Sequence, residues 1–149
     1  MDNLAKRDIA DVLPHRPPFV FVDKIVQAEG KVVTTSKIFA KEEEYFKGHF
    51  PGNPIVPGVL LIESMAQTAG IAALNVINDG KRLEGKEAMF YLSRVTDVKF
   101  KVPVLPDEEV MVTAEVIMSF GNLVKVFVKS KVANQIVAEG EIILSRTIR

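Results

Sequence analysis

The sequence has 149 residues, no cysteine, and 19 acidic and 19 basic side chains. This length predicts a single domain over residues 1–149, large enough to bury a substantial core. The absence of cysteine excludes disulfides, thiolate metal sites and cysteine nucleophiles, and the balanced charge argues against nucleic-acid binding. The N-terminal stretch lacks the continuous apolar core of a secretory signal, so we expect a cytoplasmic location.

The first half of the chain predicts one short helix followed by two strands. Residues 4–13 are expected to form the helix, which ends at Pro14. Runs rich in β-branched and aromatic residues at 19–26 and 31–39 predict the strands, with the turn between them at Gly30.

An acidic patch at 42–44 and a proline-rich loop then lead into a long apolar helix, predicted from about Gly58 to Asn78. Gly80 is a suitable terminator, because glycine tolerates the left-handed conformation found at helix ends. The helix approaches the roughly 20 residues that a bilayer requires. Its polar residues and the lack of basic anchors before it favour a helix buried inside protein instead.

Three segments of the second half alternate apolar and polar residues: "EVMVTAEVIM", "LVKVFVKSKV" and "QIVAEGEIILS". They predict an antiparallel sheet with one covered face, joined by short turns at 121–122 and 133–134. The side chains expected to face inward are Val110, Val112, Ala114, Val116, Met118, Val124, Val126, Val128, Val132, Ile136, Ala138, Ile142 and Leu144.

Only the helix predicted at 58–78 is long and apolar enough to cover this sheet face. A helix that is hydrophobic almost all round is surrounded by protein and not merely laid on a surface. The pattern therefore predicts an α+β fold in which a curved antiparallel sheet wraps around one long central helix. Part of the helix, or a sheet edge, remains available to a partner subunit.

The loop "GHFPGNPIVPG" places His49 just before the helix. Pro51, Pro54 and Pro57 lack backbone donors and fix their own φ angles, which makes the loop rigid. The helix N-terminus that follows has free N–H groups and a dipole that favours negative charge. A base beside such a site indicates catalysis, and the alternative is a loop histidine held by structural hydrogen bonds.

Glu63 is the only charged residue in "VLLIESMAQTAGIAAL" and lies about 7–8 Å along the helix axis from Gly58. A carboxylate in apolar surroundings is costly unless it is paired or protonated, and a protonated carboxyl can act as a general acid. Gln67, one turn further on, shares its face and could form a hydrogen bond with it. The alternative, a Glu63 that caps the first helical turn in solvent, is equally compatible with the sequence.

Other polar residues carry weaker signals. His15, in "LPHRPP", has no acid at a suggestive spacing and is expected to be structural. Tyr91 interrupts an apolar run and is expected to be a core or interface aromatic. A solvated basic face is expected for Arg94, Lys99, Lys101, Arg146 and Arg149.

The blocks "LPHRPPFVFVDKI" and "GHFPGNPIVPGVLLIESMAQTAG" closely resemble those of the FabZ-type 3-hydroxyacyl-[acyl-carrier-protein] dehydratases of bacterial type II fatty-acid synthesis. The resemblance covers essentially the whole chain in length and element order. It implies the hot-dog fold, a sheet wrapped around one long helix. The implied activity is dehydration of (3R)-3-hydroxyacyl-acyl-carrier-protein to the trans-2-enoyl product, without metal or redox cofactor.

By this resemblance, His49 matches the catalytic histidine, Glu63 the catalytic acid, and Gly58 the glycine whose N–H binds the thioester carbonyl. Relatives that also isomerise the double bond carry Asp at the position of Glu63, which favours a dehydratase that does not isomerise. The weaker assignments are an aromatic at the acyl tunnel, Tyr91, and carrier-protein contacts at Arg146 and Arg149.

The resemblance further implies a homodimer in which His49 of one subunit faces Glu63 of the other, with trimers of dimers common. The expected partner is acyl carrier protein, with no nucleic-acid or membrane partner. Two alternative functions remain open. One is a hot-dog acyl thioesterase, which hydrolyses the thioester, and the other is a non-catalytic acyl-binding module.

Overall fold

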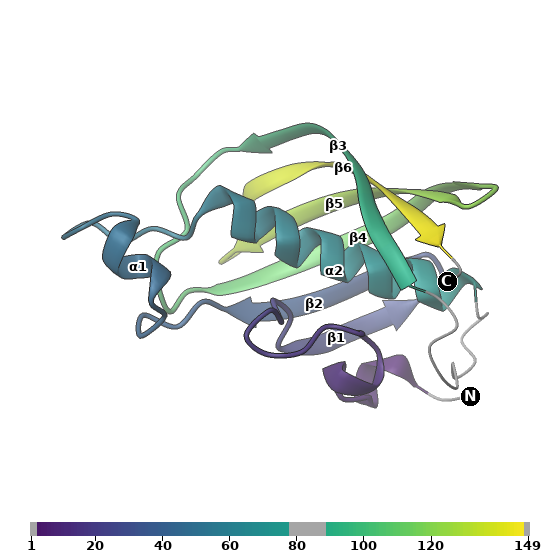
Figure 1. Cartoon of the computed structure of the whole chain (residues 1–149), viewed down its shortest axis with the longest axis horizontal. Helices are drawn as coiled ribbons and strands as arrows, with labels where there is room; N and C mark the ends of the chain where they lie inside the picture. Colours follow the sequence, from purple (N-terminus) through teal and green to yellow (C-terminus); the bar gives the residue numbers. More distant parts are fainter. Residues whose placement is uncertain (1–2, 78–88, 148–149) are drawn as a thin grey trace.

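A computed structural model describes residues 3–77 and 89–147, in which one antiparallel sheet curves around one long helix (Figure 1). The sheet has six strands in the spatial order β1-β2-β4-β5-β6-β3. The arrangement confirms the predicted α+β class and the hot-dog fold. The strands are β1 (Lys24–Glu29), β2 (Val32–Ile38), β3 (Met89–Phe100), β4 (Glu109–Phe120), β5 (Leu123–Val132) and β6 (Gln135–Thr147).

The central helix α2 spans Gly58–Ile77 and is buried without interruption from Ser64 to Leu74. It packs against β2, β4 and β5 on the concave side of the sheet (Figure 1). Its length and hydropathy would suffice to cross a membrane, but 67% of its most apolar window is buried inside the fold. The prediction that this helix fills the sheet is therefore confirmed, while the predicted end at Asn78 and Gly80 lies outside the described residues.

Most of the side chains predicted to face inward from β4, β5 and β6 are buried. Val132, at the end of β5, is only partly buried, and the other two exceptions lie at β-bulges. Met118 is 54% exposed because the β4–β5 register shifts between Val116 and Met118. Val137 is buried in place of the predicted Ile136, because the β5–β6 register shifts between Ser130 and Lys131. One extra residue in a strand moves every later side chain to the opposite face.

Two predictions for the N-terminal third are wrong. The helix predicted at 4–13 is two short 3-10 turns, η1 (Leu4–Lys6) and η2 (Ile9–Asp11). The first strand begins at Lys24 and not at residue 19, because residues 19–23 are not assigned to a strand although Phe21 and Val22 are buried. A four-residue helix, α1 (Tyr45–Gly48), was not predicted and is too short to leave a periodic pattern.

Strand β3 was also not predicted and forms one end of the described sheet. It pairs with β6 through two irregularities, one between Leu92 and Arg94 and the other between Thr96 and Lys99. At the second, Gly140 of β6 lies so close to β3 that a Cβ there would meet Val98 Cγ2 at 2.6 Å and Val98 Cα at 2.7 Å. The β3–β6 pairing therefore requires a residue without a Cβ at position 140.

We expect Gly140→Ala to lower the free energy of unfolding by about 1–3 kcal/mol, because the added methyl displaces strand backbone and not a flexible side chain. Urea unfolding followed by circular dichroism measures the effect. Glu141→Gln in the same strand is the control. It loses only the partly exposed Lys125–Glu141 ion pair, 3.3 Å long, whose expected contribution is about 0–1 kcal/mol. Equal midpoints for both variants would contradict the close-approach argument.

Candidate active site

The loop between α1 and α2 is held in shape by its own backbone. Phe50 and Asn53 exchange N–H···O bonds of 3.1 and 2.8 Å, and the Ile55 N–H donates to the His49 carbonyl at 3.0 Å. The Val56 N–H then donates to Val104 O at 2.8 Å, which ties the loop to the segment after β3. Residues 50–54 are all exposed, so the loop stands away from the body of the fold (Figure 1).

The loop fixes the orientation of the His49 ring. His49 Nδ1 lies 3.0 Å from the Ile55 carbonyl oxygen, and its ring stacks on Phe50 with centroids 4.1 Å apart. A carbonyl oxygen only accepts, so Nδ1 carries the proton in this bond and Nε2 of the neutral ring keeps its lone pair. The His49 side chain is therefore arranged as a base that acts through Nε2. The His49–Phe50 peptide bond is cis.

Gly58 begins α2 directly after the loop. The first N–H groups of a helix have no intrahelical acceptor, so the Gly58 N–H is available to an external oxygen. A Cβ at Gly58 would lie 3.0 Å from Cζ and 3.1 Å from Cε1 of the Phe100 ring. Glycine at this position therefore also lets the aromatic ring close over the helix start.

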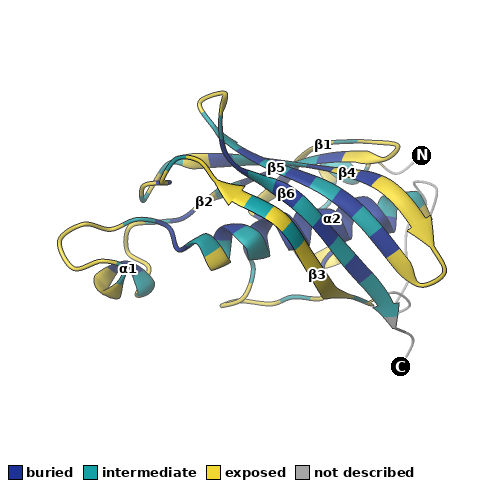
Figure 2. Cartoon of the chain, turned by 90° about the horizontal axis from the view of Figure 1, so that it is seen from above, coloured by how far each residue is buried: buried dark blue, intermediate teal, exposed yellow. Residues whose placement is uncertain are grey.

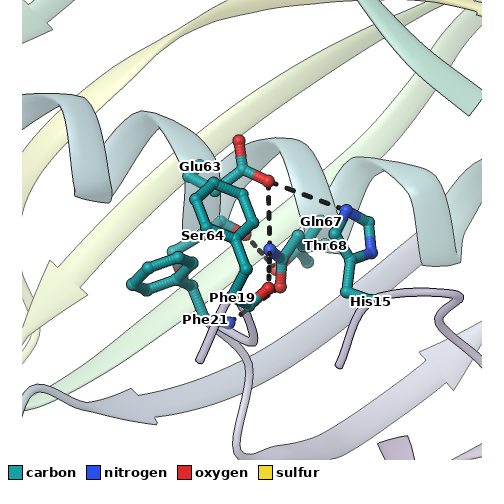
Figure 3. Close-up of polar contacts among 7 residues, drawn as sticks. All are labelled: His15, Phe19, Phe21, Glu63, Ser64, Gln67 and Thr68. Carbon is teal, nitrogen blue, oxygen red and sulfur yellow. Dashed lines mark hydrogen bonds and ion pairs between the residues drawn. The ribbon is translucent and has the colours of Figure 1, made fainter. Parts of the chain in front are cut away.

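Glu63 lies beyond the first turn of α2, with its side chain 21% exposed. Gln67 Nε2 donates to Glu63 Oε1 at 3.0 Å and to Phe19 O at 3.2 Å, while Gln67 Oε1 accepts from the Phe21 N–H at 2.8 Å (Figure 3). The predicted Glu63–Gln67 bond is confirmed, and the alternative of a solvated first-turn cap is wrong. Because the Phe21 N–H fixes the Gln67 amide, Glu63 Oε1 is held as an acceptor and Oε2 is left for another partner.

His15 is the polar neighbour that the sequence did not predict for Glu63. Its Nε2 lies 3.8 Å from Glu63 Oε1, and its Nδ1 is buried without a hydrogen-bond partner among the described residues (Figure 3). No acid stands at a suggestive sequence spacing from His15, yet the fold brings Glu63 beside it, and the expected structural role of His15 stays a prediction. The two residues lie 48 positions apart in the sequence, which conceals the contact, and the only sequence signal was the motif "LPHRPP" itself.

A cavity of about 180 Å³ opens beside Glu63 and Gln67. The N-terminal segment, α2 and the start of β3 form its walls. Tyr91, predicted to lie at an acyl tunnel, is one of its lining residues, although its side chain is 46% exposed. The remaining lining is mostly apolar: Leu13, Pro14, His15, Ala66, Gly70, Leu74, Phe90, Leu92 and Leu144.

The described part of a single chain does not bring all the predicted site residues together at one cavity. Neither His49 nor Gly58 is among the residues that line the cavity beside Glu63. Arg146 follows the cavity residue Leu144 on β6, where its backbone N–H donates to Asn122 O at 2.7 Å. Its Nε is buried without a partner among the described residues, and Arg149 lies outside them.

Tyr45, at the start of α1, is a poor candidate for acid–base chemistry. Partial burial and the nearby Glu43 carboxylate raise the pKa of Tyr45 to about 12, so its phenol stays neutral at physiological pH. Within residues 3–77 and 89–147, no three His, Asp or Glu side chains gather closely enough to hold a metal ion.

Comparison with known proteins agrees with the fold and the motifs. The family model of the FabA-like domain matches residues 13–145. The chain is 41% identical over 145 residues to the 3-hydroxyacyl-[acyl-carrier-protein] dehydratase FabZ of Ruminiclostridium cellulolyticum, covering 97% of this chain and 98% of the relative. It is 37% identical over 140 residues to the FabZ of Proteus mirabilis, covering 93% and 91%.

A solved structure, the dehydratase heterocomplex ApeI:P from Xenorhabdus doucetiae, shares the fold with a TM-score of 0.78 and 14% identity over 96% of this chain and 93% of that chain. A hypothetical thioesterase with coenzyme A from Streptococcus pneumoniae shares it with a TM-score of 0.63 and 9% identity, covering 83% and 84%. The fold alone thus accompanies more than one chemistry. The match over residues 13–145 and the near-full-length identity place this chain in the FabA-like family, beside the FabZ-type dehydratases.

Proposed function

We propose that this protein dehydrates (3R)-3-hydroxyacyl-acyl-carrier-protein to the trans-2-enoyl thioester in type II fatty-acid synthesis. The observation that carries the proposal is the oriented His49 ring, whose Nδ1 is committed to Ile55 O at 3.0 Å. A second polar group, the Glu63 carboxyl, stands at an apolar cavity suited to an acyl chain. The 41% identity to a FabZ dehydratase over 97% of the chain supports the same reaction.

The proposed mechanism divides proton transfer between two residues. His49 Nε2 removes a C2 proton while the thioester carbonyl oxygen lies at the Gly58 N–H, which stabilises the enolate-like charge. Electrons from the broken C2–H bond form the C2=C3 double bond as the C3–O bond breaks. Protonated Glu63 delivers its proton to the departing hydroxyl, which leaves as water. Removal of one such N–H donor typically costs about 10²–10³ in rate.

We propose a homodimer as the active unit, because His49 is not among the residues that line the Glu63 cavity in one chain. Strand β3 ends the described sheet, and Figure 2 shows much of it coloured as exposed. Its large apolar residues named below are between 39% and 50% exposed. A long apolar edge strand is a favourable site for pairing with another chain. Pairing through this edge would cover Met89, Tyr91, Leu92, Val95 and Phe100.

We further propose that three such dimers assemble into a hexamer in the cytoplasm. The proposed partner is acyl carrier protein. Arg146 and Arg149 remain the proposed contacts for this partner. The proposed chemistry needs no metal or redox cofactor, because His49 and Glu63 supply both proton transfers. The proposal includes neither a nucleic-acid nor a membrane partner.

A spectrophotometric assay with 3-hydroxybutyryl thioester tests the function. Dehydration is expected to produce enoyl absorbance without free thiol, and the reverse reaction is expected to hydrate crotonyl thioester. A thioesterase would instead release free thiol without enoyl absorbance. Binding without either product would favour the non-catalytic acyl-binding module.

A further inference from the structure

Gly70 occupies an unexpected position in the middle of α2, twelve residues after the helix begins at Gly58. Glycine is among the least favourable residues in a helix interior, because it gives up the most backbone freedom on folding. Such a glycine usually has a packing reason or a functional reason.

Packing does not account for Gly70. A Cβ built at this position meets no atom of the described residues within 4 Å. A Cβ at Gly58 would be in tight contact with Phe100, and one at Gly140 would collide with Val98. Gly70 is nevertheless buried in the single chain, and it is one of the residues that line the cavity beside Glu63. Glycine here leaves space inside the fold and not at its surface.

The space at Gly70 lies in line with Glu63. Cavity residues of α2 follow the spacing of one helix face: Glu63, Ala66, Gln67, Gly70 and Leu74. Gly70 lies seven residues beyond Glu63, or about 10 Å along the helix axis. Three bonds of an extended acyl chain span at most about 3.5 Å. About nine bonds therefore separate an acyl carbon beside Glu63 from one beside Gly70.

We infer that residue 70 determines how long an acyl chain the enzyme accepts, because the tail of a long substrate passes over Gly70. This inference rests on the proposed function, with the 3-hydroxyl of the substrate placed at Glu63. A butyryl group ends well before Gly70, whereas a dodecanoyl or hexadecanoyl group reaches it. Beyond this point Leu74, Phe90 and Leu144 continue the apolar wall.

The test compares kcat/KM for 3-hydroxydodecanoyl and 3-hydroxybutyryl carrier-protein thioesters in the wild type, Gly70→Ala and Gly70→Val. We expect Gly70→Val to lower the long-to-short ratio at least tenfold, because one hydrophobic group in a pocket discriminates by about 10–200-fold. Gly70→Ala is expected to lower the ratio less. It should also raise the unfolding midpoint by about 2–4 °C, since alanine favours the helix and the space is open.

Asn75→Ala is the control that distinguishes blockage of the cavity from a general loss of protein stability. Asn75 Nδ2 donates to Gly30 O at 2.8 Å, so this variant weakens the end of the helix. Residue 75 lies about 140° away from Gly70 around the helix. The ratio of kcat/KM for the long substrate to that for the short one is therefore expected to be the same in Asn75→Ala as in the wild type. An unchanged ratio in both Gly70 variants would overturn the inference, and Gly70→Ala decides alone if the valine variant does not fold. A wild type without enoyl product would instead overturn the proposed function.

Discussion

His49→Asn is expected to fold normally, to keep its loop and to lose dehydratase activity by about 10²–10⁴-fold, the usual contribution of a general base. The asparagine Nδ2 can replace His49 Nδ1 as the donor to Ile55 O, a bond of 3.0 Å in the wild type. No group remains at the position of Nε2 to accept the C2 proton. The variant therefore removes proton transfer while keeping the loop geometry.

Enoyl absorbance under single-turnover and steady-state conditions measures the loss. His49→Ala serves as the matched comparison, because it removes the bond to Ile55 O together with the base. Circular dichroism and size-exclusion chromatography show whether both variants keep the fold and the oligomer of the wild type. Turnover of His49→Asn within tenfold of the wild type would rule out His49 as the base.

The sequence predicted the centre of this molecule better than its margins. Uniform hydrophobicity identified the long helix, and the structure places α2 at Gly58–Ile77. Period-two alternation identified the last three strands. The same rule misread residues 19–26, where Phe21 and Val22 are buried although the strand begins only at Lys24. Alternation reports which side chains are buried, and it does not report how the backbone forms hydrogen bonds.

Strand β3 was not predicted for a related physical reason. Two register irregularities interrupt its pairing with β6, and Asp97 has a positive φ of 52°. Its large apolar side chains are exposed in the single chain, so no one-sided burial pattern remains in the sequence. A strand whose apolar side chains are exposed does not show the alternation of a half-buried strand.

The candidate site was predictable where its residues are close in sequence. Glu63 and Gln67 are one helical turn apart, and their hydrogen bond was predicted from that spacing alone. The approach of His15 to Glu63 depends on how the N-terminal segment crosses α2, which no local pattern encodes. The roles of His49, Glu63 and Gly58 stay predictions that rest on geometry and on resemblance to the family.

Glu63→Gln is expected to keep the local structure and to reduce dehydration by about 10²–10⁴-fold. The substituted amide oxygen can still accept the bond from Gln67 Nε2, 3.0 Å long in the wild type. An amide does not donate a proton to a departing hydroxyl, so the C3–O bond would break without acid assistance. Glu63→Asp, which keeps an acid one methylene further back, is expected to retain more activity than Glu63→Gln.

Hydrogen exchange at C2 distinguishes the two proton transfers. In deuterated water, Glu63→Gln is expected to exchange the C2 hydrogen of the substrate without forming enoyl product, because His49 and the Gly58 N–H remain in place. His49→Asn is expected to show neither exchange nor elimination. Exchange that persists in His49→Asn and disappears in Glu63→Gln would mean that the two residues have the opposite roles. Because neither variant alters the bonds that hold its partner residue, such a reversal could not be attributed to a displaced site.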